Sequence, residues 1–228
     1  MDLKEFERIV TETQDETFRE IVRENPSVIK IKKAARAVEN LRRITDATLE
    51  IANRRGFQAM SMRDLSSATG LSLGAMYAYF SSKDELLDLI QEQGRRSVFR
   101  VLAAQVEGVT APPEKLRRLI TAHIHLSELM QPWFYFSYME AKNLGKRDQK
   151  FAIESELYTE KIFTEILDEG RRAGIYREHD AVMTASLLKA VLQDWYLKRW
   201  KYRTRMVSAG DYAKFVIGFM EAYLESTQ

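Results

Sequence analysis

The helical spacing of the apolar residues is the feature that most constrains the fold of this chain. Apolar residues recur at steps of three and four along the sequence, and no stretch alternates apolar and polar residues as a half-buried strand does. An early stripe of this kind consists of Leu3, Phe6, Val10, Thr13, Thr17 and Ile21. Only 10 glycines and 4 prolines interrupt 228 residues, which leaves room for long helices. The sequence therefore predicts an all-α protein.

Several classes of protein are excluded by what the sequence lacks. With no cysteine, the chain has neither disulfides nor thiolate metal sites. Its charged N-terminus lacks the apolar stretch of a signal peptide, and no apolar run reaches the roughly 20 residues that cross a bilayer. We find no Gly-rich phosphate loop and no assignable Ser-His-Asp or carboxylate constellation. We therefore expect a cytoplasmic protein that is not an enzyme, with no cofactor, metal site or membrane partner.

Glycines, prolines and capping residues divide the chain into helices. We expect a first helix that ends before Pro26 and a second that ends at Arg55. Two short helices follow, because Ser61 and Ser72 are good N-cap residues and Gly70 separates them. Later helices are expected at about 83–107, 112–129, 132–144, 151–172, 180–201 and 209–225. This gives nine helices in addition to the N-terminal one.

Charge is distributed unevenly along the chain. Residues 1–29 carry eight acidic and four basic side chains, whereas residues 30–100 carry eight acidic and thirteen basic ones, a net charge of +5. The remaining residues, 101–228, are nearly neutral, with eighteen basic and seventeen acidic side chains. A local basic block is expected where a protein contacts phosphates, and it also occurs on solvated surfaces. The motif within the block decides between these two interpretations.

A stretch of about fifty residues in the basic block has the layout of a helix-turn-helix: a helix, a short helix, a Gly-containing turn and a second short helix. It consists of Arg42-Arg43-Ile44-Thr45-Asp46-Ala47, Arg54-Arg55-Gly56-Phe57, Ser61-Met62-Arg63-Asp64-Leu65 and the run TGLSLGAMYAYFSSKDELL from Thr69 to Leu87. This pattern closely resembles the DNA-binding domain of TetR (tetracycline-repressor-like) regulators. The resemblance implies a three-helix DNA-binding domain at 30–86 and a helical ligand-binding and dimerisation domain at 87–228, which leaves the helix predicted within residues 1–29 as an N-terminal extension. It also implies a cytoplasmic repressor that binds palindromic double-stranded operator DNA as a dimer.

Nine residues are candidates for DNA contact: Ser61, Arg63, Ser72, Leu73, Gly74, Ala75, Tyr77, Tyr79 and Lys83. The first turn that Ser61 caps offers N–H groups and a helix dipole to a phosphate. A lysine in the first turn of a helix opposes that dipole, so we expect a phosphate partner for Lys83. Tyr77 and Tyr79 are expected on the outward face, and in resembling proteins the equivalent tyrosine and lysine make such contacts.

The base-reading positions carry few polar side chains. The residues expected there, which have no side-chain hydrogen-bonding groups, are Leu73, Gly74, Ala75 and Ala78. Direct readout would therefore depend on apolar contact with thymine methyl groups, on close backbone approach at Gly74, and on Arg63 reaching a guanine. As an alternative, these residues are simply helix formers on a solvated face.

The last two expected helices carry an apolar stripe that suits dimerisation. The stripe consists of Tyr212, Phe215, Val216, Phe219 and Tyr223, together with Val182, Ala185, Leu188 and Leu192 of the preceding helix. The resemblance places the subunit interface on these helices, where they would form half of a four-helix bundle. An ordinary intramolecular core is the alternative.

Two segments rich in aromatic residues, one around Phe134 and one around Trp195, are candidates for an effector site. The alternative is that they belong to the hydrophobic core. We expect a largely apolar effector, with or without an anionic head as in a fatty acid or an acyl-coenzyme A, near His123, Phe134, Tyr138 and Trp195. The basic run between 198 and 205 is a further candidate for attracting an anion.

The alternative function is a constitutive DNA-organising or cell-division-linked protein, which an absence of any enclosed pocket would favour. His123 and His125 lie on different faces of their helix, so they do not suggest a metal site.

Overall fold

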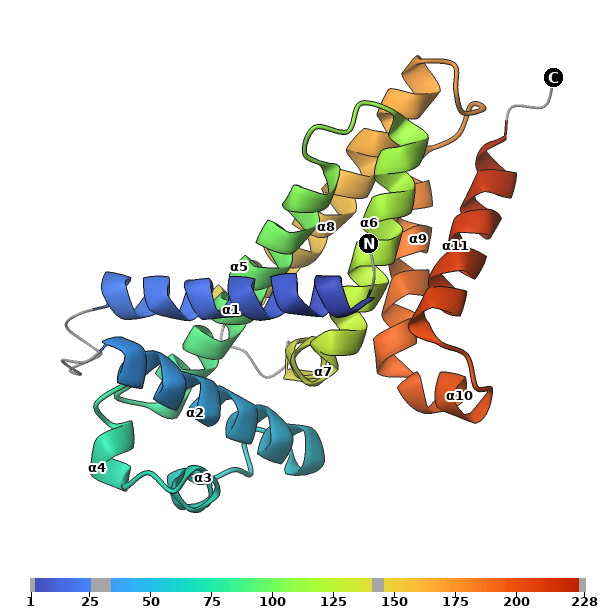
Figure 1. Ribbon diagram of the computed structural model, residues 1–228. Helices are drawn as coiled ribbons and strands as arrows, with labels where there is room; N and C mark the ends of the chain where they lie inside the picture. Colours follow the sequence, from blue (N-terminus) through green and yellow to red (C-terminus); the bar gives the residue numbers. More distant parts are fainter. Residues whose placement is uncertain (1–2, 26–33, 141–145, 226–228) are drawn as a thin grey trace. The chain divides into compact units, whose positions relative to one another are not determined.

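The computed structural model describes residues 3–25, 34–140 and 146–225, and within these ranges all regular secondary structure is helical (Figure 1). The helices are α1 (Leu3–Glu24), α2 (Ala34–Arg55), α3 (Met62–Thr69), α4 (Leu73–Met76), α5 (Lys83–Val106), α6 (Pro112–Leu129), α7 (Gln131–Glu140), α8 (Lys146–Arg172), α9 (Ala181–Leu197), α10 (Arg199–Thr204) and α11 (Ala209–Leu224). The all-α prediction is confirmed. The helix expected at 180–201 is divided in two, because the backbone leaves helical geometry at Lys198, between α9 and α10.

The helices belong to two compact units. Unit 1 comprises Met1–Val98 and Pro132–Gln149, and unit 2 comprises Phe99–Gln131 and Lys150–Gln228. This division differs from the domain ranges expected from the sequence. The N-terminal helix belongs to the same unit as the helix-turn-helix, and so do α7 and most of α5.

In unit 1, α1 packs along α2. Its buried face consists of Phe6, Val10, Thr17, Phe18 and Ile21. At its polar edges, Asp15 forms an ion pair with Arg42 of α2, and Glu24 lies 2.7 Å from Arg96 of α5. The predicted amphipathic helix therefore packs on its own subunit, where its acidic side chains pair with basic side chains of α2 and α5.

Helix α7 packs against α5 within unit 1, although it is distant from the helix-turn-helix in the sequence. The Trp133 indole N–H donates to the carbonyl of Ile90 at 3.1 Å, and the Ser137 hydroxyl donates to Gln91 at 2.8 Å. The indole fills the space above Gly94, where an added Cβ would lie only 1.9 Å from the ring. Any larger residue at position 94 would clash with the indole, so Gly94 is what allows α7 to pack closely on α5.

Unit 2 is built around α6, which packs against both α9 and α11. Its buried core includes Leu119, Ile120, Ile124, Phe163, Leu167, Leu188, Leu192 and Val216. Within the described ranges, no helix combines the length and the apolar character needed to cross a bilayer.

Candidate nucleic-acid interface

The first helix of the motif, α3, begins at a complete capping box. The Asp64 N–H donates to the Ser61 hydroxyl oxygen at 3.1 Å, and the Asp64 carboxylate accepts from the Ser61 backbone N–H at 2.9 Å. These hydrogen bonds from Ser61 lower the pKa of Asp64, so the box is intact at neutral pH. The predicted N-cap at Ser61 is confirmed. The capping box uses the N–H groups of Ser61 and Asp64, which leaves fewer donors of this turn for a phosphate than the sequence suggested.

The turn between the two short helices depends on Gly70. Its φ of 67° lies in the left-handed region, and its N–H donates to the Ser66 carbonyl at 2.9 Å. The Ser66 hydroxyl donates to the Leu71 carbonyl at 2.6 Å, and the Arg43 guanidinium of α2 donates to the Thr69 carbonyl. The turn is therefore fixed from both sides, which sets the angle between α3 and α4.

Helix α4 is a single turn that places a small, mostly apolar surface toward solvent. Ser72 caps it, accepting from the Ala75 N–H at 3.2 Å. Leu73 and Tyr77 are 38% and 49% exposed, and Gly74 is exposed too. A Cβ added at Gly74 would meet no atom within 4 Å. The open space at this glycine is what close approach to a DNA groove requires.

Tyr79 does not lie on the outward face, and that expectation was wrong. Its side chain is fully buried, and its hydroxyl accepts from the Asn40 amide of α2 at 2.8 Å. The reason is that α4 ends at Met76, so the helical periodicity from which Tyr79 was placed does not continue. Met76 and Phe80 are also buried, while Tyr77 is exposed, as expected.

Lys83 has intramolecular partners in place of the phosphate that we expected. Its ammonium donates to the carbonyls of Phe57, Gln58 and Met60 at 2.7, 3.1 and 2.9 Å. It also lies 4.7 Å from the centroid of the Phe57 ring. An ammonium has three protons, so these three carbonyls use all of its donors. Phosphate contact by Lys83 stays a prediction, and the structure adds a role that the sequence did not suggest.

A second contact holds the same segment from the side of α7. The buried Glu140 carboxylate accepts from the Phe57 backbone N–H at 3.2 Å, and Phe136 packs edge-to-face on Phe57 with centroids 5.8 Å apart. Phe57 thus receives Lys83 at its carbonyl and Glu140 at its amide. The segment that leads into α3 is therefore tied to both α5 and α7.

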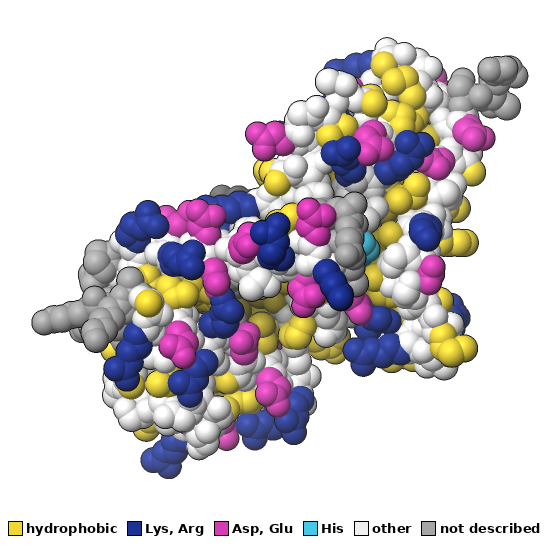
Figure 2. Space-filling model, in the orientation of Figure 1, with side chains coloured by type: hydrophobic (Ala, Val, Ile, Leu, Met, Phe, Trp, Pro, Cys, Tyr) yellow, Lys and Arg dark blue, Asp and Glu magenta, His cyan; other side chains and the backbone are white. Residues whose placement is uncertain are grey.

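The charges of unit 1 are mixed across this surface. Figure 2 shows lysine and arginine side chains interspersed with acidic ones over the region of α2, α3 and α4. Arg63 is exposed on α3, while Arg55 lies 3.4 Å from Asp64. Three lysines at the start of the basic block, Lys30, Lys32 and Lys33, lie outside the described residues. Within the described chain, six of the predicted contact residues are exposed: Ser61, Arg63, Ser72, Leu73, Gly74 and Tyr77.

The apolar surface of α9 and α11 differs in detail from the predicted stripe. Tyr212, Val216, Ala185, Leu188 and Leu192 are buried inside unit 2, so for these residues the core alternative holds. The exposed apolar residues are Val182, Met183, Leu187 and Val191 of α9, and Phe215, Phe219 and Tyr223 of α11. We call these seven residues the α9–α11 apolar face. The error arose because apolar spacing identifies a helix face without telling whether it packs within a subunit or between subunits.

The predicted effector residues lie in both units. Phe134 and Tyr138 belong to α7 in unit 1, whereas His123 and Trp195 belong to unit 2. Trp195 is fully buried, stacked on Tyr212 at 4.9 Å on one side, with the Arg199 guanidinium 4.3 Å from its centroid. Trp195 therefore has the contacts of a core residue, and its place in an effector site remains a prediction that this packing does not favour.

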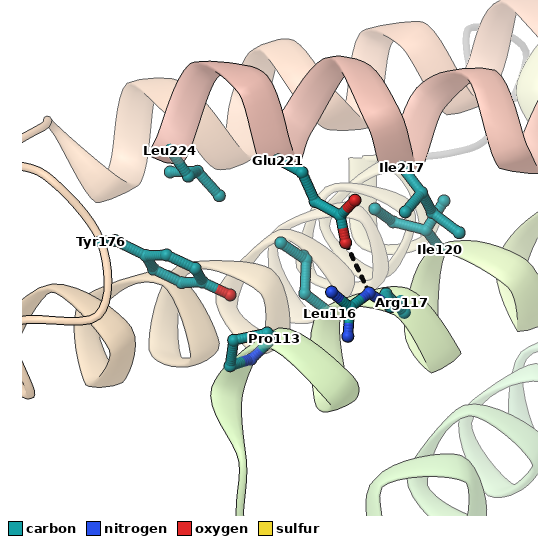
Figure 3. Close-up of a pocket in the computed structure, with 8 residues that line it drawn as sticks. All are labelled: Pro113, Leu116, Arg117, Ile120, Tyr176, Ile217, Glu221 and Leu224. Carbon is teal, nitrogen blue, oxygen red and sulfur yellow. Dashed lines mark hydrogen bonds and ion pairs between the residues drawn. The ribbon is translucent and has the colours of Figure 1, made fainter. Parts of the chain in front are cut away.

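A small hollow lies in unit 2 between α6, α11 and Tyr176 (Figure 3). Its volume is about 230 Å³, including solvent at its mouth. Arg117 and Glu221 form an ion pair of 2.5 Å at its side, and none of the predicted effector residues lines it. Drug-sized ligands usually occupy about 300–1,000 Å³. This hollow is therefore too small for the expected effector as it stands.

Comparisons with known proteins agree with this geometry. The model of the family described as "Bacterial regulatory proteins, tetR family" matches residues 44–90, and that described as "Tetracyclin repressor-like, C-terminal domain" matches residues 109–202. The HTH-type transcriptional regulator HbdR of Aromatoleum sp. (strain CIB) is 21% identical over 186 residues, which cover 82% of this chain and 81% of HbdR.

Solved structures with the same fold extend over most of the chain. A regulatory protein of the tetR family from Rhodococcus RHA1 is 22% identical, with a TM-score of 0.71, and the match covers 83% of this chain and 98% of that one. AibR, solved in complex with isovaleryl coenzyme A and operator DNA, is 19% identical, with a TM-score of 0.70 and coverage of 79% and 97%. At these identities, the likeness to the two structures concerns the fold.

Proposed function

This chain belongs to the TetR family of transcriptional regulators, and on that premise we propose that it is a ligand-responsive repressor that binds an inverted-repeat operator as a homodimer. The observation that carries the proposal is the exposed end of α4. Leu73, Gly74 and Tyr77 lie at the surface of a capped, rigidly held helix, and the space over Gly74 is open. In a helix-turn-helix, the second short helix enters the major groove.

We assign the residues that contact bases and those that contact phosphates from the exposure of their side chains. Leu73 and Ala75 contact thymine methyl groups, and Arg63 reaches a guanine or a phosphate from α3. Tyr77 donates to a phosphate, and the caps at Ser61 and Ser72 orient the two helices. Tyr79 is left out of the contact set because it is buried against Asn40.

The α9–α11 apolar face is the proposed subunit interface. Residues 183, 187 and 191 follow one another at four-residue steps, as do residues 215, 219 and 223. These are rows of the kind that interlock when helices pack. Phe215 and Phe219 are more than 60% exposed, and large apolar side chains grouped in this way usually mark an interface.

We further propose that a small acyl-type molecule releases the operator. AibR is a relative in fold that was solved with an acyl-coenzyme A and operator DNA. The effector would act by a population shift, favouring a state of the dimer in which the two copies of α4 no longer match successive major grooves. Three segments connect the units covalently: α5, the junction of α6 and α7, and the first turn of α8. They are the proposed route of coupling.

A constitutive DNA-binding protein is the second candidate. The small volume of the hollow in Figure 3 is the observation that favours it, because a protein without an effector needs no pocket. The two candidates differ in one measurement: release of the operator by fatty acids or acyl-coenzyme A thioesters occurs only for the first.

Selection of binding sites from genomic DNA fragments tests the proposal. A homodimer of helix-turn-helix subunits should enrich an inverted repeat whose half-sites are centred about 34–36 Å apart, or somewhat more. Enrichment of no inverted repeat, with a protein that is folded and dimeric, would overturn it.

A further inference from the structure

A buried polar cluster in unit 2 joins three helices. Lys189 of α9 is 6% exposed, and its Nζ lies 3.4 Å from His123 Nε2 of α6 and 3.5 Å from Glu156 Oε2 of α8. Gln193, one turn after Lys189, donates its amide to Glu156 Oε1 at 2.6 Å. The Phe163 ring lies 6.5 Å from that of His123, and Glu160 of α8 also acts electrostatically on Lys189. We call Lys189, His123, Glu156 and Gln193 the Lys189 cluster.

The Lys189 ammonium is poorly compensated for a buried charge. Charge-assisted hydrogen bonds are usually 2.7–2.9 Å long, and both of its contacts are longer. Burial lowers the pKa of Lys189, against the opposite effect of Glu156 and Glu160, and burial together with the Lys189 charge lowers the pKa of His123 well below 6.5, so the imidazole is neutral and adds no charge to the cluster. Burying an ammonium in this way costs stability that an apolar residue would not. Packing alone does not explain a lysine at this buried position, whereas a role in binding an anion does.

Glu156 indicates what the cluster can bind. Its two oxygens lie against Lys189 and Gln193, so a carboxylate already fits between these donors. The Glu156 side chain is 43% exposed, in contrast to the 7% of Lys189. Glu156 can therefore turn into water, and a ligand carboxylate that takes its place keeps the buried Lys189 charge paired. The donors that it would leave behind are fixed on a packed helix.

We propose that Lys189 and Gln193, with His123 beside them, bind the carboxylate of an organic acid with an apolar body, and that Glu156 occupies this place in the ligand-free protein. The carboxylate replaces that of Glu156 at the two α9 donors, and the apolar body lies among the core side chains of α6, α8 and α9. This deepens the proposed function by naming the chemical group that the effector carries, and it rests on that function only for the consequence at the operator.

The experiment measures direct binding without DNA, so that failure at the operator does not affect it. Isothermal titration with octanoate is compared with 1-octanol, which has the same chain length and no charge. Lys189→Met keeps the length of the side chain and removes its charge. We expect it to weaken octanoate binding about tenfold or more, the usual effect of losing a hydrogen bond to a charged group, and to leave 1-octanol binding unchanged.

Glu156→Gln is the second variant, and it separates binding from a structural ion pair. If Glu156 competes with the ligand, this variant binds octanoate at least as tightly as the wild type. Undetectable octanoate binding by the wild type, equal octanoate affinity of the wild type and Lys189→Met, or parallel losses in both variants would each overturn the proposal. Because Glu156 is partly exposed, the Gln variant should fold even if Lys189→Met does not.

Discussion

At the scale of single residues, Phe57 is held by contacts with three other side chains. Its carbonyl accepts from Lys83, its amide donates to Glu140, and its ring contacts Phe136. The Lys83 ammonium therefore donates to three backbone carbonyls. Its position in the first turn of a helix had suggested a phosphate as its partner. The motif identified Lys83 as important, but it did not identify what the lysine contacts.

We predict that Lys83→Met lowers the free energy of unfolding by about 1–3 kcal/mol, because carbonyls that had a charged donor lose it. Urea denaturation measures this. The control is Lys161→Met, which removes an exposed lysine of α8 and should change stability by less than about 0.5 kcal/mol. Lys83 would instead contact a phosphate if the variant kept its stability and bound DNA with a shallower slope of log affinity against log salt concentration, by about one unit.

His123 should make stability depend on pH. Burial lowers its pKa well below 6.5, so between that value and its folded pKa the unfolded chain binds a proton that the folded chain does not. Stability is therefore expected to fall as the pH falls from about 6.5, with a slope of up to about 1.4 kcal/mol per pH unit from this group. In melting experiments between pH 7.5 and 5, His123→Gln should flatten this slope. An identical slope in the variant would contradict the assignment.

At the scale of helices, the local signals were predictable and the packing partners were not. The caps at Ser61 and Ser72 and the left-handed Gly70 follow from residue types at fixed spacings, and all three are confirmed. The inward turn of Tyr79 depends on where a one-turn helix ends, which spacing does not define. The docking of α7 on α5 depends on a pair 39 residues apart in the sequence, Trp133 and Gly94, and a single sequence carries no signal for such a pair.

The packing of α7 on α5 predicts the effect of a small substitution. Gly94→Ala gains helix propensity, but its methyl group would lie about 2 Å from the Trp133 ring, so one of the two helices must shift. Overpacking of this kind costs about 1–3 kcal/mol. The matched control is Gly74→Ala, which has open space around it and should not lose stability. Equal melting temperatures for the two variants would contradict the described contact.

At the scale of the whole molecule, the α9–α11 apolar face predicts the oligomeric state. Phe215→Glu places a charge within this apolar face, at a residue that is 72% exposed in the single chain. We expect the variant to be monomeric by light scattering at concentrations at which the wild type is a dimer. Lys214→Glu, also exposed on α11 but outside that face, is the control and should remain dimeric. A dimeric Phe215→Glu variant would place the interface elsewhere.

DNA binding through the exposed end of α4 is the central claim, and Gly74 gives its most direct test. Gly74→Glu meets no atom within 4 Å at its Cβ, so the variant should fold, but its carboxylate would stand where α4 enters the groove. The measurement is a titration of the selected operator with the wild type, with Gly74→Glu and with Ala173→Glu, whose new charge lies on the surface of unit 2. We predict at least about a tenfold loss of operator affinity for Gly74→Glu, equivalent to about 1.4 kcal/mol, and wild-type affinity for Ala173→Glu. Wild-type affinity in a folded Gly74→Glu protein would contradict the claim.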